Sequence, residues 1–186
     1  MVKALGLRLF SSFNLKPQRY AFVGAVDGHY AGVTLFSSPQ YGGFLEKFLY
    51  KFNLVDVNLP VQRWVELLNN FKPHVLCGYS AAVNMLGEEQ RRTELNISPH
   101  TMICSGEPLN SVFEANIRSS FGVPPTDYYS ASESLSLGVR SPGSQCIHLF
   151  DDVNCFEASG ENMGYFLTNL YNYSFPLIRC KMTDQL

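Results

Sequence analysis

Charged residues are scarce in this chain. Asp, Glu, Lys and Arg make up 16% of the 186 residues, and the Lys and Arg side chains are scattered rather than grouped. The sequence therefore lacks the basic footprint of a nucleic-acid-binding protein, and we predict no nucleic-acid partner. Long apolar runs are also missing. None approaches the length of a membrane span, and Arg8 interrupts the N-terminal apolar run before it reaches the length of a signal-peptide core.

Paired cysteines are missing as well. The chain has five cysteines, an odd number without regular spacing. This argues against a disulfide framework and favours a reducing compartment, so a cytoplasmic location is expected. Cys77 and Cys104 end apolar runs, which predicts that both are buried as small apolar side chains. Four residues in the last part of the chain are of the types that bind zinc, namely Cys146, His148, Cys155 and Cys180. Their spacings fit no standard closed zinc site.

Apolar and aromatic residues, by contrast, are abundant. Hydrophobic residues make up 46% of the chain and aromatic residues 13%. This composition argues against disorder, and the length is sufficient for one domain with a substantial core. The apolar surplus also suggests that part of the apolar surface is normally covered.

The first part of the chain repeats an order of apolar run, small-residue loop and helical stretch. The runs at 20–26, 75–77 and 102–104 read as strands, 81–90 reads as a helix, and Asn110 or Ser111 is expected to cap another. Residues 42–52 read as a helix and 53–59 as a strand. This order predicts an α/β fold, a largely parallel sheet with flanking helices.

Residues 135–186 have a different character. Short β-like runs at 135–149, 153–157 and 165–169 alternate with Gly, Pro and Asn turns. They predict a short β-rich meander or small barrel. We therefore expect residues 1–134 to form the α/β part of one domain and residues 135–186 its β-rich part.

Ligand-binding groups are expected where the predicted parallel strands end. In such sheets ligands bind beyond the carboxyl ends of the strands, so the loops at Gly28, Gly78, Ser105 and Tyr129 should cluster. The stretch Asp127-Tyr128-Tyr129-Ser130-Ala131-Ser132-Glu133 offers an aromatic ring, hydroxyl groups and a carboxylate. These groups suit a flat base, a phosphate and a hard cation. By spacing alone, an ordinary polar loop is the simpler interpretation.

Taken with its neighbours, this stretch forms an ordered set of motifs across nearly the whole chain. The set comprises Gly28-His29-Tyr30-Ala31-Gly32, residues 71–80 ending in Gly78-Tyr79-Ser80, Ser105-Gly106-Glu107-Pro108-Leu109, Tyr129 to Glu133, Leu167-Thr168-Asn169-Leu170, and Pro176-Leu177-Ile178-Arg179 with Asp184. It resembles the adenylate-forming (AMP-binding) superfamily, and within it the phenylacetate–CoA ligase-like branch that includes capsular-polysaccharide-associated relatives.

The resemblance implies a two-step reaction. ATP and a small carboxylic acid give an acyl-adenylate and pyrophosphate, and a thiol, coenzyme A, then takes the acyl group. Tyr129 would stack on adenine and Ser132 would hydrogen-bond the α-phosphate. Glu133 would hold Mg²⁺, which neutralises charge as pyrophosphate leaves. Ser132 and Glu133 are thus the catalytic candidates.

The resemblance assigns further residues to the nucleotide and the acid. Ser105, Gly106 and Glu107 match the loop beside adenine and ribose, and Asp184 matches the carboxylate that accepts from ribose hydroxyl groups. His29 and Tyr79 stand near the family's acyl pocket. The remaining cofactor-binding candidates belong to the same stretch as Tyr129, namely Asp127, Tyr128 and Ser130.

The sequence also departs from the family pattern. Ser130 replaces a usual Gly, Ser132 a usual Thr, and Thr183 the Gly expected before Asp184. No Ser/Thr/Gly-rich phosphate loop ending in Lys occurs in the chain, and the small lysine-bearing domain of the family is absent. We therefore expect an internal fragment that is inactive alone. A homodimer, a non-catalytic binding or scaffold descendant, and an adenylyltransferase with another acceptor stay open as alternatives.

Overall fold

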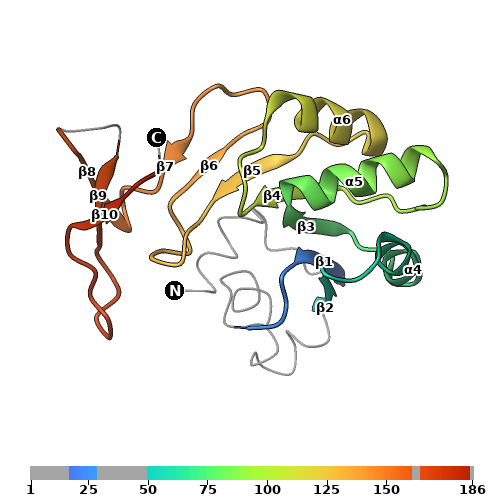
Figure 1. The fold of residues 1–186 in the computed structure, drawn as a ribbon, viewed down its shortest axis with the longest axis horizontal. Coiled ribbons are helices and arrows are strands. Elements are labelled where there is room, and N and C mark those ends of the chain that lie inside the picture. Colours follow the sequence, from blue (N-terminus) through green and yellow to red (C-terminus); the bar gives the residue numbers. More distant parts are fainter. Residues whose placement is uncertain (1–16, 29–49, 161–163, 185–186) are drawn as a thin grey trace.

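Strands and helices alternate along most of the computed structural model of the chain, which describes residues 17–28, 50–160 and 164–184 (Figure 1). In chain order the elements are β1 (Gln18–Gly24), β2 (Tyr50–Asp56), α4 (Val61–Phe71), β3 (Val75–Tyr79), α5 (Ser80–Arg91), β4 (Thr101–Ser105), α6 (Ser111–Phe121), β5 (Thr126–Tyr129), β6 (Gly138–Arg140), β7 (His148–Leu149), β8 (Asn154–Ala158), β9 (Tyr165–Asn169) and β10 (Cys180–Met182).

A seven-stranded sheet runs through the chain in the order β2-β1-β3-β4-β5-β6-β7. The pairings from β2 to β5 are all parallel, whereas β6 and β7 join antiparallel at one side. The strands predicted at 20–26, 75–77 and 102–104 are β1, β3 and β4. The predicted fold class, a mainly parallel sheet with flanking helices and a short β-rich part, is confirmed.

The prediction around residue 50 was wrong in part. Tyr50 to Phe52, expected to end a helix, form the first half of β2, and the strand ends at Asp56 rather than at Leu59. Tertiary pairing explains the difference, because Tyr20 of β1 lies opposite Phe52 and stacks on it with ring centroids 5.0 Å apart. Aromatic pairs across strands stabilise a sheet in a way that local helical spacing does not reveal. Residues 42–49 lie outside the described part of the chain.

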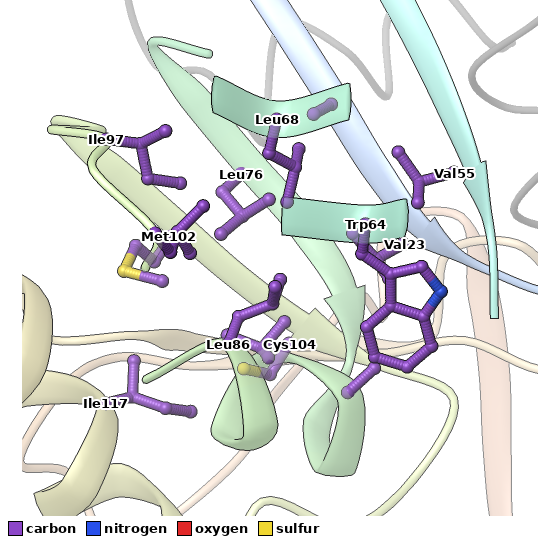
Figure 2. Packing of buried hydrophobic residues seen from close by; sticks show 14 of the residues in the cluster. Val23, Val55, Trp64, Leu68, Leu76, Leu86, Ile97, Met102, Cys104 and Ile117 are labelled. Carbon is purple, nitrogen blue, oxygen red and sulfur yellow. The ribbon is translucent and has the colours of Figure 1, made fainter. Parts of the chain in front are cut away.

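The three helices of the described residues, α4, α5 and α6, lie on one face of the sheet. Alternate strand residues such as Val23, Leu76 and Met102 are buried on that face, where they pack with Trp64 of α4 and Ile117 of α6 (Figure 2). The Trp64 indole N–H donates to the Asp56 carbonyl oxygen at 2.9 Å, which satisfies the polar atom of this buried ring. The buried apolar side chains of the helices thus find their partners in the sheet.

The other face of the sheet carries its own apolar cluster. Tyr20, Phe22, Cys77 and Tyr128 point to this side and pack with Phe150 from the segment after β7. The burial predicted for Cys77 is confirmed, since it is 2% exposed, and burial raises the pKa of its thiol. Because both faces of the central strands are buried, those strands read as nearly continuous apolar runs in the sequence.

Helix ends follow the local sequence closely. Asn110 caps α6 as predicted, because its side-chain oxygen accepts from the Phe113 backbone N–H at 2.8 Å. Gly122 ends the same helix with a positive φ of 70°. Helix α5 begins at Ser80, one residue before the start predicted from the sequence. The Ser80 hydroxyl donates to the Glu107 carbonyl oxygen at 2.9 Å.

The smaller sheet is an antiparallel meander, β8-β9-β10, at the end of the molecule away from α4 (Figure 1). Asn154, at the start of β8, is fully buried, and its side chain connects this smaller sheet to the loop before β6. The Asn154 side-chain oxygen accepts from the Ser134 hydroxyl at 3.1 Å, and its amide nitrogen donates to the Ser136 carbonyl oxygen. The domain boundary at residues 134 and 135 stays a prediction. Within the described ranges, no helix has the length and apolar character needed to cross a membrane.

We expect stability to depend on pH through His74. Its ring nitrogen Nδ1 accepts from the Arg19 backbone N–H at 3.2 Å, which requires a neutral ring. Burial, with help from Arg19 and His100, lowers the pKa of His74 below its ordinary value of 6.5. The unfolded chain therefore takes up this proton first, so the free energy of unfolding should fall as the pH falls below about 6.5.

Denaturant unfolding between pH 5 and pH 8 checks this expectation. His74→Asn keeps an acceptor near the Nδ1 position but does not titrate, so it should flatten the pH dependence. His148→Asn, at an exposed histidine of β7, is the control and should leave the dependence unchanged. Equal slopes for His74→Asn and the unsubstituted chain would contradict the assignment.

Candidate functional site

The parallel register brings the carboxyl ends of the central strands to one edge. Tyr79 at the end of β3 lies opposite Ser105 at the end of β4, and Ser105 lies opposite Tyr128 near the end of β5. Helix α5, which begins at Ser80, and the loops that begin at Gly106 and Ser130 therefore leave from the same edge, as expected for the ligand-binding side of such a sheet.

Tyr129 and Asp184 meet beyond this edge, although 55 positions separate them in the sequence. The Tyr129 hydroxyl donates to Asp184 Oδ2 at 2.6 Å, and its oxygen lies 2.7 Å from the hydroxyl oxygen of Tyr165. The structure thus joins a predicted adenine-stacking residue to a predicted ribose-binding residue. Tyr165, the first residue of β9, was not among the residues predicted from the sequence.

Both phenols are held in the protonated state. Burial raises the pKa of Tyr129 far above its ordinary value, and the hydrogen bond to Asp184 raises it further. Burial also raises the pKa of Tyr165, to which the Asp184 and Glu133 carboxylates add. The carboxylate of Glu133, the predicted metal ligand, thus acts electrostatically on Tyr165.

Ser132 and Glu133 stand on a tight, exposed turn. Backbone hydrogen bonds between Ala131 and Ser134 close the turn in both directions, at 2.9 and 3.2 Å. Ser134 is buried and bonded to Asn154, so the base of the turn is fixed while Ser132 and Glu133 face solvent. A fixed base with exposed hydroxyl and carboxylate groups suits contact with a phosphate and its cation.

The loop after β4 is fixed by its own glutamate. The Glu107 carboxylate accepts from the Ala81 backbone N–H at 3.1 Å, at the positive end of α5. Gly106 has a φ of 77°, and a Cβ there would lie 2.9 Å from the Tyr79 ring. Only glycine fits this close approach without strain. In the loop predicted to lie beside adenine, the Glu107 side chain therefore caps helix α5, and Gly106 lies against the ring of Tyr79.

Asp127 and Tyr128 also have internal partners. Arg140 of β6 donates to the Asp127 carboxylate at 3.1 Å, to Glu114 of α6 at 3.1 Å, and to the Leu109 carbonyl oxygen at 2.7 Å. Tyr128 is 3% exposed and donates to the Leu135 carbonyl oxygen. Burial raises the pKa of Asp127, and the Arg140 guanidinium opposes that shift. Whether Asp127 and Tyr128 also contact a ligand stays a prediction.

The two acyl-pocket candidates differ in what the structure says of them. His29 lies outside the described residues. Tyr79 is half-buried at the end of β3, with its ring edge-on to Phe22 at a centroid distance of 6.1 Å. Two further residues, Tyr165 and Arg140, organise the site but were not predicted. Each is a residue with a polar group on a short strand, and this is the feature of the sequence by which they could have been found.

No ready-made metal cluster exists among the residues that the structure describes. Within those ranges, no group of three or more His, Cys, Asp or Glu side chains converges on one point. A cation at Glu133 would therefore take one protein carboxylate and complete its shell with phosphate oxygens and water. Mg²⁺ commonly binds in that way in phosphate-handling sites, so the donor set fits this ion.

Arg140 should be worth much more to stability than an exposed arginine. Arg140→Leu leaves the Asp127 carboxylate unpaired and leaves Glu114 with only the 3.7 Å contact to Arg118, in a partly buried site where 16% of the Arg140 side chain is exposed. We expect a loss of about 3 kcal/mol in the free energy of unfolding, measured by denaturant titration.

Arg63→Leu is the matched control for that prediction. Arg63 pairs with Glu66 on the surface of α4, with half of its side chain exposed. Its loss should cost no more than about 1 kcal/mol. In the Arg140→Leu background, Asp127→Asn with Glu114→Gln should recover part of the lost stability. Equal costs for the two arginines would refute the special role of Arg140.

Comparison with known proteins gives structural neighbours only. No protein-family profile matches the sequence. No curated protein matches it either. Among solved structures, the chain is similar to an open conformation of 2-hydroxyisobutyryl-CoA ligase in complex with 2-HIB-AMP and CoA. The TM-score is 0.73 and the identity 20%, over 97% of this chain and 42% of the ligase.

Two other ligases show the same likeness. An anthranilate CoA ligase in complex with anthranoyl-AMP matches with a TM-score of 0.60 and 11% identity, over 91% of this chain and 35% of that one. A benzoate CoA ligase from Burkholderia xenovorans LB400 matches with a TM-score of 0.55 and 14% identity, over 96% and 38%. The chain spans less than half the length of each. These neighbours are CoA ligases of the adenylate-forming superfamily, and the chain has the fold of the part of them that it covers.

Proposed function

We propose that this chain forms the nucleotide-binding part of an ATP-dependent acid–thiol ligase. The full-length protein would join a small carboxylic acid to AMP with release of pyrophosphate. It would then pass the acyl group to the thiol of coenzyme A with release of AMP. The observation that carries this proposal is the hydrogen bond between Tyr129 and Asp184, two distant residues assigned by the motifs to adenine and ribose of one nucleotide.

The fold supports the proposal independently of the motifs. Of the three ligase structures named above, two contain an acyl-AMP, and one of these also contains CoA. The corresponding chemistry needs an aromatic face for the base, an acceptor for the ribose, and a charge-bearing turn for the phosphate. Tyr129, Asp184 and the Ser132–Glu133 turn supply these groups at one edge of the sheet.

Each candidate residue then has a limited task. Tyr129 would stack on adenine, Ser132 would donate to the α-phosphate, and Glu133 would contribute one oxygen ligand to Mg²⁺. The cation would supply charge neutralisation as pyrophosphate leaves. Ser105 and Gly106 would line the other side of the nucleotide through their backbone, since the Glu107 carboxylate caps α5. Tyr79, with His29, would border the acid.

The motifs resemble those of the phenylacetate–CoA ligase-like branch, and on that resemblance we propose an aromatic or otherwise apolar acid. A nucleotide-binding descendant without turnover is the main competitor. Two observations favour this competitor. The carboxylates of Asp127 and Glu107 already bind to groups within the chain, and Ser130 adds a side chain where the family has glycine. The experiments below separate the two, because only the ligase releases pyrophosphate in an acid-dependent manner.

Two substitutions should give different kinetic signatures in the full-length protein. Glu133→Gln removes a metal ligand used most as pyrophosphate departs, so it should lower kcat more than it raises the KM for ATP. Tyr129→Ala removes stacking that is present in the ground and transition states alike. That loss is worth roughly 1–3 kcal/mol and should raise the KM for ATP by about fivefold to 150-fold. Acid-dependent pyrophosphate release, with a panel of carboxylic acids, measures both.

Glu88→Gln is the control for the charge change, since Glu88 is an exposed residue of α5. It should change neither parameter. If the Glu133 and Tyr129 variants of an active protein kept normal ATP binding and turnover, the assigned roles would be wrong.

Residues 1–186 alone should not catalyse adenylation. The sequence contains no Ser/Thr/Gly-rich loop ending in Lys to orient the triphosphate, and no lysine-bearing domain to complete charge stabilisation. Loss of either positioning element should cost orders of magnitude in rate. Acid-dependent exchange of labelled pyrophosphate into ATP by the purified chain, above that of its Glu133→Ala variant, would refute this expectation.

A further inference from the structure

The tyrosine pair next to Asp184 has a definite hydrogen-bond direction. A carboxylate accepts and has no hydrogen to give, so the 2.6 Å contact uses the single hydroxyl hydrogen of Tyr129. The 2.7 Å contact between Tyr129 and Tyr165 then needs the hydrogen of Tyr165. The three groups form a one-way relay, in which Tyr165 donates to Tyr129 and Tyr129 donates to Asp184.

We propose that Tyr165 is a positioning residue for the nucleotide site, because it holds the Tyr129 hydroxyl and, through it, the Asp184 carboxylate in place for a ribose hydroxyl group. This inference rests on the proposed function. Tyr165 would touch no ligand itself. Its contribution is to fix two groups that the ligand does touch.

The surroundings of Tyr165 make it a rigid anchor. Its side chain is 3% exposed and packs among Leu137, Leu167 and Met182. Tyr165 pairs with Met182 in the antiparallel register of β9 and β10, so the start of β9 lies beside the end of β10. Asp184 follows Met182 by two residues. The anchor is therefore built into the same hairpin that delivers the carboxylate.

Asp184, in contrast, is exposed and lies just beyond the end of a strand of three residues. An exposed carboxylate at such a place has many rotamers, and ordering it costs conformational entropy. Its Oδ2 atom is used by Tyr129, and within the described residues no hydrogen bond to its Oδ1 atom is seen. A relay with a charged acceptor at its end is stronger than isolated neutral bonds. It leaves Oδ1 to read a sugar hydroxyl.

Tyr165→Phe tests the relay and keeps the ring packing. Calorimetry with the 186-residue chain should show tighter binding of AMP than of 2′-deoxy-AMP or 3′-deoxy-AMP. The variant should weaken AMP binding about threefold to tenfold, the size expected for one hydrogen bond. It should weaken the binding of the deoxy analogue that lacks the recognised hydroxyl group less. The ribose preference therefore shrinks. In an Asp184→Asn background, Tyr165→Phe should have no further effect on this preference.

Tyr20→Phe is the matched control for loss of a hydroxyl from a buried tyrosine. Tyr20 is 7% exposed and lies on β1, which β3 and β4 separate from β5. It should leave the ribose preference unchanged. A merely structural role of Tyr165 would lower stability in both variants and would shift the preference in neither.

A second measurement needs no nucleotide. With tyrosine labelled at the ring carbon that bears oxygen, NMR detects hydroxyl protons that exchange slowly because they are hydrogen-bonded. The Tyr129 hydroxyl proton should remain visible in Tyr165→Phe but move upfield, because its own oxygen has lost a donor. An unchanged Tyr129 resonance overturns the relay, whatever the nucleotide experiment shows.

The two failures are thus distinguishable. If the chain binds AMP and the resonance moves, but the ribose preference stays the same in Tyr165→Phe, the positioning role is wrong and the proposed function stands. If the unsubstituted chain binds neither AMP nor an acyl-adenylate, the proposed function of the chain fails. The ribose-directed role of Tyr165 then fails with it. A moved resonance together with a reduced ribose preference supports the inference.

Discussion

Parallel pairing of the strands from β1 to β5 is the constraint on which the candidate site depends. The register aligns Gly24, Tyr79, Ser105 and Tyr129 at or near the ends of strands that run in the same direction. Each crossover helix returns the chain to the opposite edge, so every following loop emerges at the same place. The buried apolar rows on both faces of these strands set the register, because a slip by one residue would exchange the two rows.

Polar contacts then decide the shape of the loops that the register brings together. Arg140 ties the start of α6 to β5 and β6, Glu107 ties the loop after β4 to α5, and Asn154 ties the turn before Ser134 to β8. All three contacts join segments that are distant in the sequence. The Asn154 contact is buried and the Arg140 contacts are partly buried, so they are costly to leave incomplete, and for that reason they specify one arrangement of the loops.

The sequence predicts the fold better than the contacts within the site. Apolar runs and their following small residues locate β1, β3 and β4, and Asn110 and Gly122 mark both ends of α6. Spacing does not reveal that Phe52 stacks on Tyr20 of the neighbouring strand, or that Tyr50 meets the same ring edge-on, instead of ending a helix. It also does not reveal that Glu107 faces a helix terminus or that Asp127 faces Arg140. A carboxylate in a loop motif has the same appearance in a sequence whether it binds a ligand or a backbone N–H.

The smaller sheet explains how Tyr129 and Asp184, which lie far apart in the sequence, come into contact. Because β9 and β10 are antiparallel, the chain enters β9 at Tyr165 and leaves β10 near Asp184 at the same end of the hairpin. That end faces the carboxyl end of β5, where Tyr129 bonds to both residues. The antiparallel hairpin thus supplies the Asp184 carboxylate, a hydrogen-bond acceptor, next to Tyr129 at the end of the parallel sheet. The proposed nucleotide site therefore depends on the contact between the two sheets as much as on either sheet. The buried hydrogen bonds of Asn154 stabilise that contact, so this residue supports the site without lying in it.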